Sequence, residues 1–288
     1  MRSFDYIESG KTLLTPHTTS LLAAIHEAKG RQSIQTTIRP DILGTLVAVA
    51  RIQSTDASNR IEGISTSDSR LNDLVSEKVT PRNRNEEEIA GYRDALSVIH
   101  ESHDYIPITP NVILQLHRDL FRHTPLTFAG HFKDSDNVII ERDAHGTSTV
   151  RFAPPSALVT PELIERACSA YTQAIRDGHT DPLLAIAMFI LDFICIHPFN
   201  DGNGRMSRLL TLLMLYRNGY MVGKYISIEH LIEQSKSTYY EALDASTQGW
   251  DDNANDYAPF TNYLLGIILS ACKEFDERIN LCLLYTSP

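Results

Sequence analysis

An uninterrupted run of hydrophobic side chains, LLAIAMFILDFICI, occupies residues 183–196 with a single charged residue inside it. Asp181 and Pro182 stand directly before the run, and these residue types favour the N-cap and the first turn of a helix. Pro198 follows the run and lacks the backbone N–H that a continuing helix needs. The pattern therefore predicts a buried helix over residues 183–196 that ends in a turn.

Apolar residues recur at three- and four-residue spacing over residues 40–57 and 85–100, which predicts two further helices. Glutamates occupy positions 86–88 and favour a helix N-terminus, where carboxylates meet the positive end of the helix dipole. The polar segment 78–85, which contains a proline, is typical of a linker with solvated charges. No repeat or low-complexity tract interrupts the chain, and the predicted fold class is mostly α.

The helical pattern breaks between residues 130 and 155. Residues 138–140 and 149–152 are short β-prone runs, separated by the turn-forming stretch 143–147. A β-hairpin is therefore predicted here. A surface hairpin without a functional role is the alternative interpretation.

Acidic residues outnumber basic ones, with 36 Asp and Glu against 26 Lys and Arg, which gives a formal net charge of −10. Sequence-independent binding to nucleic acid depends on a basic surface. We therefore expect no nucleic acid partner for this chain, and a protein partner instead.

Several features predict a soluble, cytoplasmic protein. The chain opens without a charged-then-apolar signal segment, and the run at 183–196 is too short to span a bilayer and contains Asp192. Widely spaced cysteines without a CxxC pair are typical of reduced core thiols. The cysteines are Cys168, Cys195, Cys272 and Cys282.

The segment HPFNDGNGR, from His197 to Arg205, combines side chains suited to phosphate chemistry. The pKa of a histidine near neutrality suits His197 to take a proton from a hydroxyl. Asp201 supplies a hard oxygen for Mg²⁺, and the 202–204 glycine turn before a new helix favours an anion at the helix N-terminus. Arg205 and Arg208 lie on neighbouring positions of that helix, which is expected to start near Arg205. A capped helix-turn-helix with solvated arginines is the alternative.

This segment, followed by Arg208, resembles the HPFx(D/E)GNGRxxR active-site motif of the Fic family of protein adenylyltransferases. Every fixed position is matched, and the resemblance extends from about residue 45 to about residue 265. It implies a Fic-type helical bundle with a short β-hairpin flap, at about 130–153, over the active site. It also implies an N-terminal helical region, 1–104, and a catalytic core, 105–288, with C-terminal helices.

The resemblance implies that His197 is the general base and that Asp201 binds Mg²⁺. Phe199 is expected to point into the core and anchor the loop. Tyr239 and Tyr240 resemble the wall of the nucleobase pocket, with ordinary core packing as the alternative. The whole set implied to contact the nucleotide is Phe199, Asn200, Asp201, Gly202, Asn203, Gly204, Arg205, Arg208, Tyr239 and Tyr240.

The segment SNRIEG, from Ser58 to Gly63, has the pattern of a helix C-terminus with Gly63 as its left-handed cap. Glu62 is unusual there, because a carboxylate is disfavoured at the negative end of a helix dipole. The segment resembles the (S/T)xxxE(G/N) inhibitory motif of the Fic family, in the class whose inhibitory helix, here about 45–63, precedes the core. The resemblance implies that Glu62 reaches Arg208 and occupies the place of the γ-phosphate. A capped helix with a solvated Glu62 is the alternative.

The predicted function is autoinhibited, Mg²⁺-dependent transfer of AMP from ATP to a Ser, Thr or Tyr hydroxyl of a protein, including self-modification. The resemblance implies that the hairpin edge docks the target by strand addition. The sequence does not decide between a monomer and a homodimer. Removal of AMP from a modified protein at the same site is one alternative. A nucleotide-binding regulator without turnover is another.

The remaining histidines lack the spacing of a metal site such as HExxH. They are predicted to be surface or capping residues, and they include His100, His103, His117 and His123.

Overall fold

The computed structural model describes residues 2–38, 40–142 and 148–286. Helices make up most of the described chain, which confirms the predicted mostly-α class. The elements are α1 (Tyr6–Thr12), α2 (Pro16–Ile38), α3 (Pro40–Ile61), α4 (Asp68–Val75), α5 (Arg84–Ser102), the 3-10 helix η1 (His103–Tyr105), α6 (Pro110–Leu120), β1 (Ile139–Arg142), β2 (Ser148–Phe152), α7 (Thr160–Asp177), α8 (Pro182–Ile196), α9 (Asn203–Arg217), the 3-10 helix η2 (Val222–Lys224), α10 (Ile228–Gln234), α11 (Lys236–Thr247) and α12 (Ala258–Thr286).

The helices predicted from periodicity are confirmed as α3, α5 and α8. Local caps explain where two of them begin. The Asp181 carboxylate accepts the Leu183 N–H at 2.9 Å, and the Asn83 side chain accepts the Glu86 N–H at 3.0 Å. Each cap satisfies a backbone donor that the first helical turn leaves without a partner.

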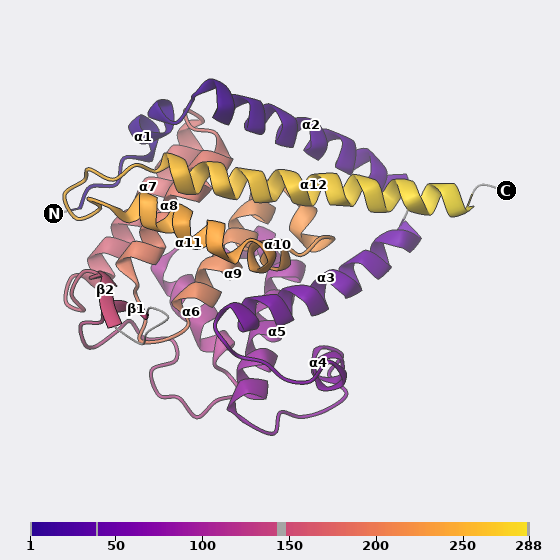
Figure 1. Ribbon diagram of the computed structural model, residues 1–288, viewed down its shortest axis with the longest axis horizontal. Coiled ribbons are helices and arrows are strands. Elements are labelled where there is room, and N and C mark those ends of the chain that lie inside the picture. The colour runs from indigo at the N-terminus through magenta and orange to yellow at the C-terminus, as the bar shows by residue number, and fades with distance from the viewer. Residues whose placement is uncertain (1, 39, 143–147, 287–288) are drawn as a thin grey trace.

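Helix α8 lies at the centre of the molecule, packed against α7, α9, α11 and α12 (Figure 1). Nearly all of its side chains are buried, because helices cover it on several sides. This enclosure explains a segment that is hydrophobic all round instead of along one face. The turn that follows α8 is therefore anchored to the buried core.

One carboxylate, that of Asp192, is completely buried within α8. It accepts hydrogen bonds from Arg2 at 2.9 Å, Tyr6 at 2.9 Å, Trp250 at 2.6 Å and Tyr257 at 2.8 Å. A buried charge is tolerated when it is paired and hydrogen-bonded in this way. The cluster ties the N-terminal residues and the segment after α11 to the central helix.

The N-terminal helices pack against distant parts of the chain. α2 runs beside α12, while α3 contacts α5 and α10 (Figure 1). α5 approaches α6 closely at Gly91, where a Cβ would collide with the Leu120 carbonyl. This packing carries the C-terminal end of α3 to α9. The boundary predicted near residue 104 stays a prediction.

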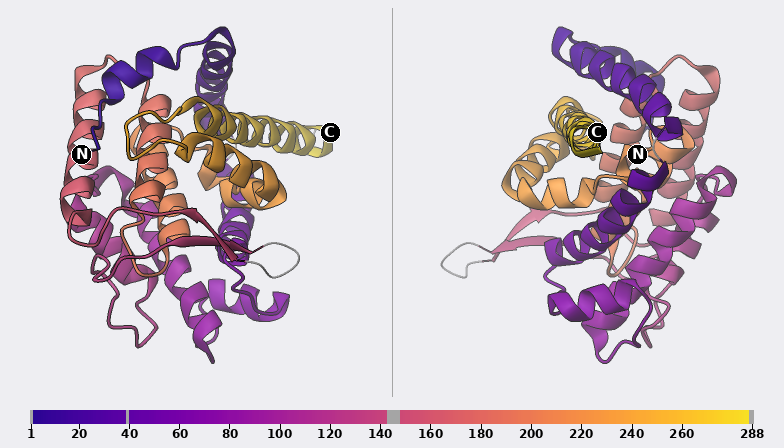
Figure 2. Two further views of the ribbon diagram at one scale, coloured as in Figure 1. Left: turned by 60° about the vertical axis from the view of Figure 1, so that its left-hand side comes forward. Right: turned by 90° about the vertical axis from the view of Figure 1, so that its right-hand side faces the viewer.

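Strands β1 and β2 pair antiparallel, with Ile140 opposite Val150 and a register shift between Ile139 and Ile140. Figure 2 shows the pair extending beyond the helical body. The predicted turn at 143–147 lies outside the described residues. The flap role implied for this hairpin stays a prediction.

Cys168, Cys195 and Cys272 are buried with free thiols, in agreement with their interpretation as core residues. The side chain of Cys282 lies outside the described part. None of the described helices combines the length and the apolar character that a membrane span requires.

Candidate active site

The loop between α8 and α9 places the predicted catalytic residues. α8 ends at Ile196, and His197 adopts a left-handed conformation with φ +48°, which a non-glycine residue adopts at a cost of about 1 kcal/mol or more. Gly202 has φ +82° and serves as the N-cap of α9. α9 begins at Asn203, two residues before the predicted start. The two left-handed positions turn the chain sharply enough to bring His197 beside the N-terminus of α9.

The His197 imidazole is partly buried and has a defined orientation. Its Nδ1 lies 3.4 Å from the Ile194 carbonyl oxygen, which can only accept, so Nδ1 carries the proton and Nε2 keeps its lone pair. Burial lowers the pKa of His197 to about 4, and the nearby Lys133 charge acts in the same direction. The expectation of a pKa near neutrality was therefore wrong. The imidazole is neutral at physiological pH and able to accept a proton.

Phe199 and His117 anchor the loop to α6. Phe199 is completely buried and stacks on the His117 ring, with centroids 3.7 Å apart and an interplanar angle of 1°. The Gly130 N–H donates to His117 Nδ1 at 2.9 Å, so the other ring nitrogen donates to the Asp201 carbonyl at 3.0 Å. The prediction that His117 lies at the surface was wrong, because the motif loop itself covers it. His100 is also buried, at 5% exposure.

Asn203 closes the loop from inside. Its side-chain oxygen accepts the Phe199 N–H at 2.9 Å, and its Nδ2 donates to the Phe199 carbonyl at 2.8 Å. Asn200, by contrast, is exposed and donates to Asp134 at 3.3 Å. The two asparagines of the motif therefore have different surroundings, and only Asn203 supports the loop from within.

Lys133 and Asn137 hold the same loop, and the sequence analysis missed both. Lys133 Nζ donates to the Ile196 carbonyl at 3.2 Å, and its backbone N–H donates to the Pro198 carbonyl at 2.8 Å. Asn137 donates to the Phe199 carbonyl at 3.3 Å. Burial lowers the pKa of Lys133 to about 8. Nothing in the sequence around Lys133 indicated that this lysine would be buried.

Glu62 reaches Arg208 from the end of α3. Glu62 Oε1 lies 2.8 Å from the Arg208 guanidinium, and Ser58 accepts from the same guanidinium through its hydroxyl and its carbonyl, each at 2.8 Å. Burial raises the pKa of Glu62, but attraction to Arg208 outweighs it, so that this pKa lies below its ordinary value. A Cβ at Gly204 would collide with Glu62 Oε1, so only glycine lets the carboxylate approach the first turn of α9.

The turn after α3 aims Glu62 at this position. Gly63 has φ +77°, as the left-handed cap that the sequence predicted. The Ile64 N–H donates to the Asn59 carbonyl and the Gly63 N–H to the Arg60 carbonyl, each at 3.0 Å, which is a Schellman motif. The cap stops α3 so that the side chain of residue 62 points towards α9.

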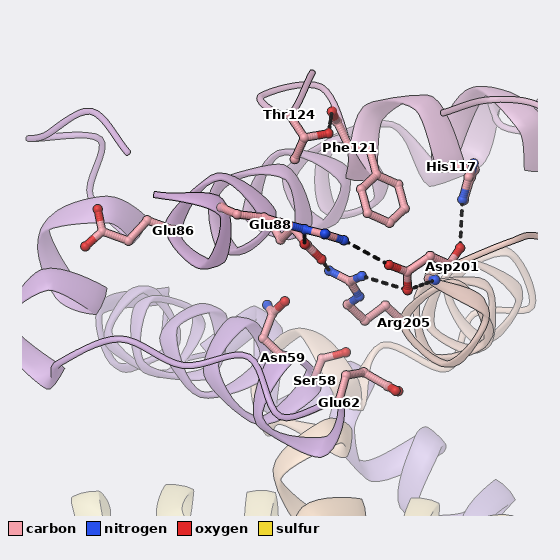
Figure 3. A network of polar contacts seen from close by, with 12 residues as sticks. Ser58, Asn59, Glu62, Glu86, Glu88, His117, Phe121, Thr124, Asp201 and Arg205 are labelled. Carbon is pink, nitrogen blue, oxygen red and sulfur yellow. Dashed lines mark hydrogen bonds and ion pairs between the residues drawn. The ribbon is translucent and has the colours of Figure 1, made fainter. Parts of the chain in front are cut away.

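Arg205 pairs with a different glutamate. Its guanidinium lies 2.7 Å from Glu88 on α5 and 3.7 Å from the Asp201 carboxylate (Figure 3). Glu88 also binds Arg84 at 2.7 Å, and Arg84 lies 3.3 Å from Asp201. The sequence analysis did not assign Arg84 or Glu88 to the site. Their four-residue spacing on a helix face was the available signal.

A cavity of about 220 Å³ opens between the motif, α11 and the end of α3. Phe152, at the end of β2, contributes to its wall and packs on Trp250 with ring centroids 6.3 Å apart. Seven residues predicted for the site line it: Glu62, His197, Asn203, Gly204, Arg208, Tyr239 and Tyr240. Seven others are not among its lining residues in the described structure: Ser58, Gly63, Phe199, Asn200, Asp201, Gly202 and Arg205.

Asp201 offers a single carboxylate whose side chain is 44% exposed. Within the described ranges, no group of three or more His, Cys, Asp or Glu side chains is arranged to hold a metal ion. Mg²⁺ commonly binds through one or two carboxylates and completes its shell with water and phosphate oxygens. The residues present therefore fit Mg²⁺ held together with a phosphate ligand.

Comparison with known proteins bears on the same region. Residues 107–215 match the Fic/DOC family model. Protein adenylyltransferase fic-1 of Caenorhabditis elegans is 26% identical over 189 residues, 63% of this chain and 32% of that protein. A Fido domain-containing protein of Dictyostelium discoideum is 37% identical over 90 residues, 30% of this chain and 58% of that protein. A crystal structure of a Fic family protein from Desulfovibrio desulfuricans superposes with a TM-score of 0.74 at 24% identity, covering 92% of this chain and 75% of that one.

The helical fold and the loop geometry define a Fic-type bundle. The family match over residues 107–215 and the similarity to the related adenylyltransferases identify this part of the chain as a Fic-type domain. The chain spans only 32% and 58% of the two curated relatives, so the activity of a whole relative does not transfer directly.

Proposed function

We propose that the chain is an autoinhibited, Mg²⁺-dependent adenylyltransferase that moves AMP from ATP to a hydroxyl of a protein. The observation that carries this proposal is the cavity in which the neutral His197 imidazole, the N-terminus of α9 and Arg208 face one space. A base beside an anion-binding helix terminus and a guanidinium is what phosphoryl-type transfer requires. The names of the related adenylyltransferases favour AMP as the transferred group.

In the proposed step, His197 Nε2 takes the proton of the target hydroxyl as the oxygen attacks the α-phosphorus of ATP. The bond to the β-phosphate breaks, and pyrophosphate leaves. Amides at the start of α9 and the Arg208 guanidinium would hold the phosphates, while Tyr239 and Tyr240 would pack against the base. Mg²⁺, held by Asp201, would supply charge that offsets the phosphate charge.

Autoinhibition follows from competition for one guanidinium. Glu62 binds Arg208 from inside the cavity, so a phosphate that reached Arg208 would have to displace the carboxylate. The cavity is also smaller than the roughly 300–1,000 Å³ of common ligand pockets. Both features support Glu62 as an occupant of part of the nucleotide site.

The β1–β2 pair offers a binding mode for the target. A two-stranded sheet leaves outer edges whose backbone groups can pair with an extended segment. Because Phe152 at the end of β2 lines the cavity, a segment added to this sheet would lie near His197. We propose that the target docks there, with its hydroxyl directed at the imidazole.

Incubation with ATP labelled at the α-phosphate tests the proposal. Glu62→Gly should incorporate about 10- to 100-fold more label than wild type, the range expected from a coupling of about 1–3 kcal/mol between competing occupants. The double variant Glu62→Gly/His197→Ala should incorporate about 10²- to 10⁴-fold less than Glu62→Gly, since relief of inhibition cannot replace the base. Label at the γ-phosphate should not be transferred and serves as the control.

The outcomes separate the alternatives. Equal incorporation by wild type and Glu62→Gly over a range of ATP concentrations would contradict the inhibitory role. Release of AMP from a modified target, lost in Glu62→Gly, would support the reverse reaction with Glu62 orienting a water. Tight nucleotide binding by all three proteins without transfer or release would indicate a regulator without turnover.

A further inference from the structure

The Asp201 carboxylate is faced by a guanidinium on each of its oxygens. Oδ1 lies 3.7 Å from Arg205 (Figure 3) and accepts the Gly202 N–H at 2.6 Å. Oδ2 lies 3.3 Å from Arg84. The side that a cation would approach is therefore occupied by an arginine from a helix that begins 117 residues earlier in the chain.

The two arginines differ in their freedom to move. The Arg205 side chain is 1% exposed and is enclosed between Glu88 and the Phe121 ring, whose centroid lies 5.0 Å away. The Arg84 side chain is 59% exposed. Arg205 is therefore a fixed part of the loop, and Arg84 is the partner that can leave Asp201.

Glu88 keeps Arg84 close after it leaves. The Arg84 Nε atom pairs with Glu88 Oε1 at 2.7 Å, while a different nitrogen of the same guanidinium contacts Asp201. Release from Asp201 therefore leaves the Glu88 contact intact. Arg84 also occupies the first residue of α5, where the helix dipole adds further positive potential.

We propose that Arg84 competes with the divalent cation for Asp201 and so sets the cation concentration that the site requires. This inference rests on the proposed function, which assigns Asp201 to the metal. An exposed arginine–carboxylate pair is weak in water, so a dication can displace it. The positive charge stays near the cation after displacement and lowers its affinity by repulsion.

The test measures cation binding directly, with Mn²⁺ in place of Mg²⁺. The full chain carrying Glu62→Gly is titrated with Mn²⁺ in the presence of a non-hydrolysable ATP analogue, and free Mn²⁺ is counted by electron paramagnetic resonance. Adding Arg84→Gln should lower the Mn²⁺ dissociation constant about 2- to 10-fold, because the competing charge is gone. Adding Arg84→Lys keeps the positive charge and should change the Mn²⁺ dissociation constant less than about 2-fold, because one exposed ion pair contributes little free energy.

Arg82→Gln is the matched control. Arg82 is an exposed arginine two residues earlier, and no contact joins its side chain to Asp201 within the described structure, so its loss should leave the constant unchanged. If Arg84→Gln weakened Mn²⁺ binding or left it unchanged, the competition would be disproved. The same holds if Arg82→Gln tightened binding as much as Arg84→Gln, since the effect would then be one of overall charge.

Asp201→Ala separates this inference from the proposed function. Loss of Mn²⁺ binding in Asp201→Ala, together with an unchanged constant in Arg84→Gln, would overturn only the role of Arg84. Unchanged binding in Asp201→Ala would overturn the metal assignment itself, and the role of Arg84 with it.

Discussion

The two motif arginines, Arg205 and Arg208, are three residues apart on α9, and each is paired with a glutamate from an earlier part of the chain. The Arg205–Glu88 pair is 2.7 Å long, with side chains 1% and 3% exposed. The Arg208–Glu62 pair is 2.8 Å long, with side chains 4% and 33% exposed. The pairs are alike in chemistry and differ in the access of solvent to the carboxylate.

The difference comes from where each glutamate lies on its helix. Glu88 is within α5 and is enclosed by the packing of that helix. Glu62 follows the last residue of α3, where the chain turns and the side chain extends into the cavity. A buried pair cannot exchange partners without leaving a charge unpaired in the protein interior, whereas Glu62 is the carboxylate that the proposed phosphate ligand would displace. The Arg205–Glu88 pair thus supports the loop, whereas the Arg208–Glu62 pair lies in the cavity.

Breaking the buried pair should have the largest effect on stability. Glu88→Gln keeps the side-chain shape but leaves the buried Arg205 charge with only the more distant Asp201 carboxylate, 3.7 Å away, as a counter-charge. We expect the free energy of unfolding, measured by urea denaturation, to fall by about 3–5 kcal/mol. Glu62→Gln is the control and should lose less, because the Glu62 side chain is 33% exposed and solvent reaches its carboxylate. Equal losses of unfolding free energy in the two variants would show that the two ion pairs contribute equally to stability.

Acid should weaken both halves of the site through their histidines. Burial lowers the pKa of His117, beside Asp201, and of His197, in the cavity, to about 4. The unfolded chain binds protons near pH 6.5 while the folded chain does not, so stability falls as pH decreases from about 6.5 to about 4. Each group should contribute up to about 1.4 kcal/mol per pH unit within that window.

Unfolding free energies at pH 7.5, 6.0 and 5.0 measure this dependence. His117→Gln should give a smaller slope with pH than wild type, whatever its stability at pH 7.5. An identical slope would mean that His117 does not resist protonation in the folded state.

The smallest expected change in the free energy of unfolding comes from loss of a hydrogen bond to Arg208. Ser58→Ala removes the hydroxyl that accepts from Arg208 Nε at 2.8 Å, and should lower the free energy of unfolding by about 1 kcal/mol. Alanine at the exposed Ser65 serves as the control and should have almost no effect. A loss for Ser58→Ala as large as that for Glu88→Gln would show that the contacts of Arg208 contribute as much to stability as the Arg205–Glu88 pair.

Sequence patterns predicted the features that neighbouring residues decide. α8 follows from an apolar run with a cap before it and a proline after it, and the turn at Gly63 follows from its place after an amphipathic helix. The pairing of Glu62 with Arg208 was expected only through the resemblance to a motif. The sequence itself indicated no more than that Glu62 was poorly placed at a helix end.

Burial was where sequence reasoning failed. His117 was predicted to be a surface or capping residue because the histidines lack metal-ligand spacing, yet Phe199 stacks on its ring from 82 positions away in the chain. The sequence around Lys133 gave no signal of its burial either. Local context does not specify which distant element will pack over a polar side chain.

The sequence by itself determined helices α3, α5 and α8, the sharp turn between α8 and α9, and the chemical groups that this turn carries, because caps, glycines and apolar spacing act over a few residues. Tertiary structure decided which carboxylate each arginine meets, which imidazole is neutral and which face of Asp201 is occupied. Those properties depend on distance and desolvation, and both are set only when α3, α5 and α6 pack against the loop. Arg205 and Arg208 therefore differ in role although the motif presents them as equivalents.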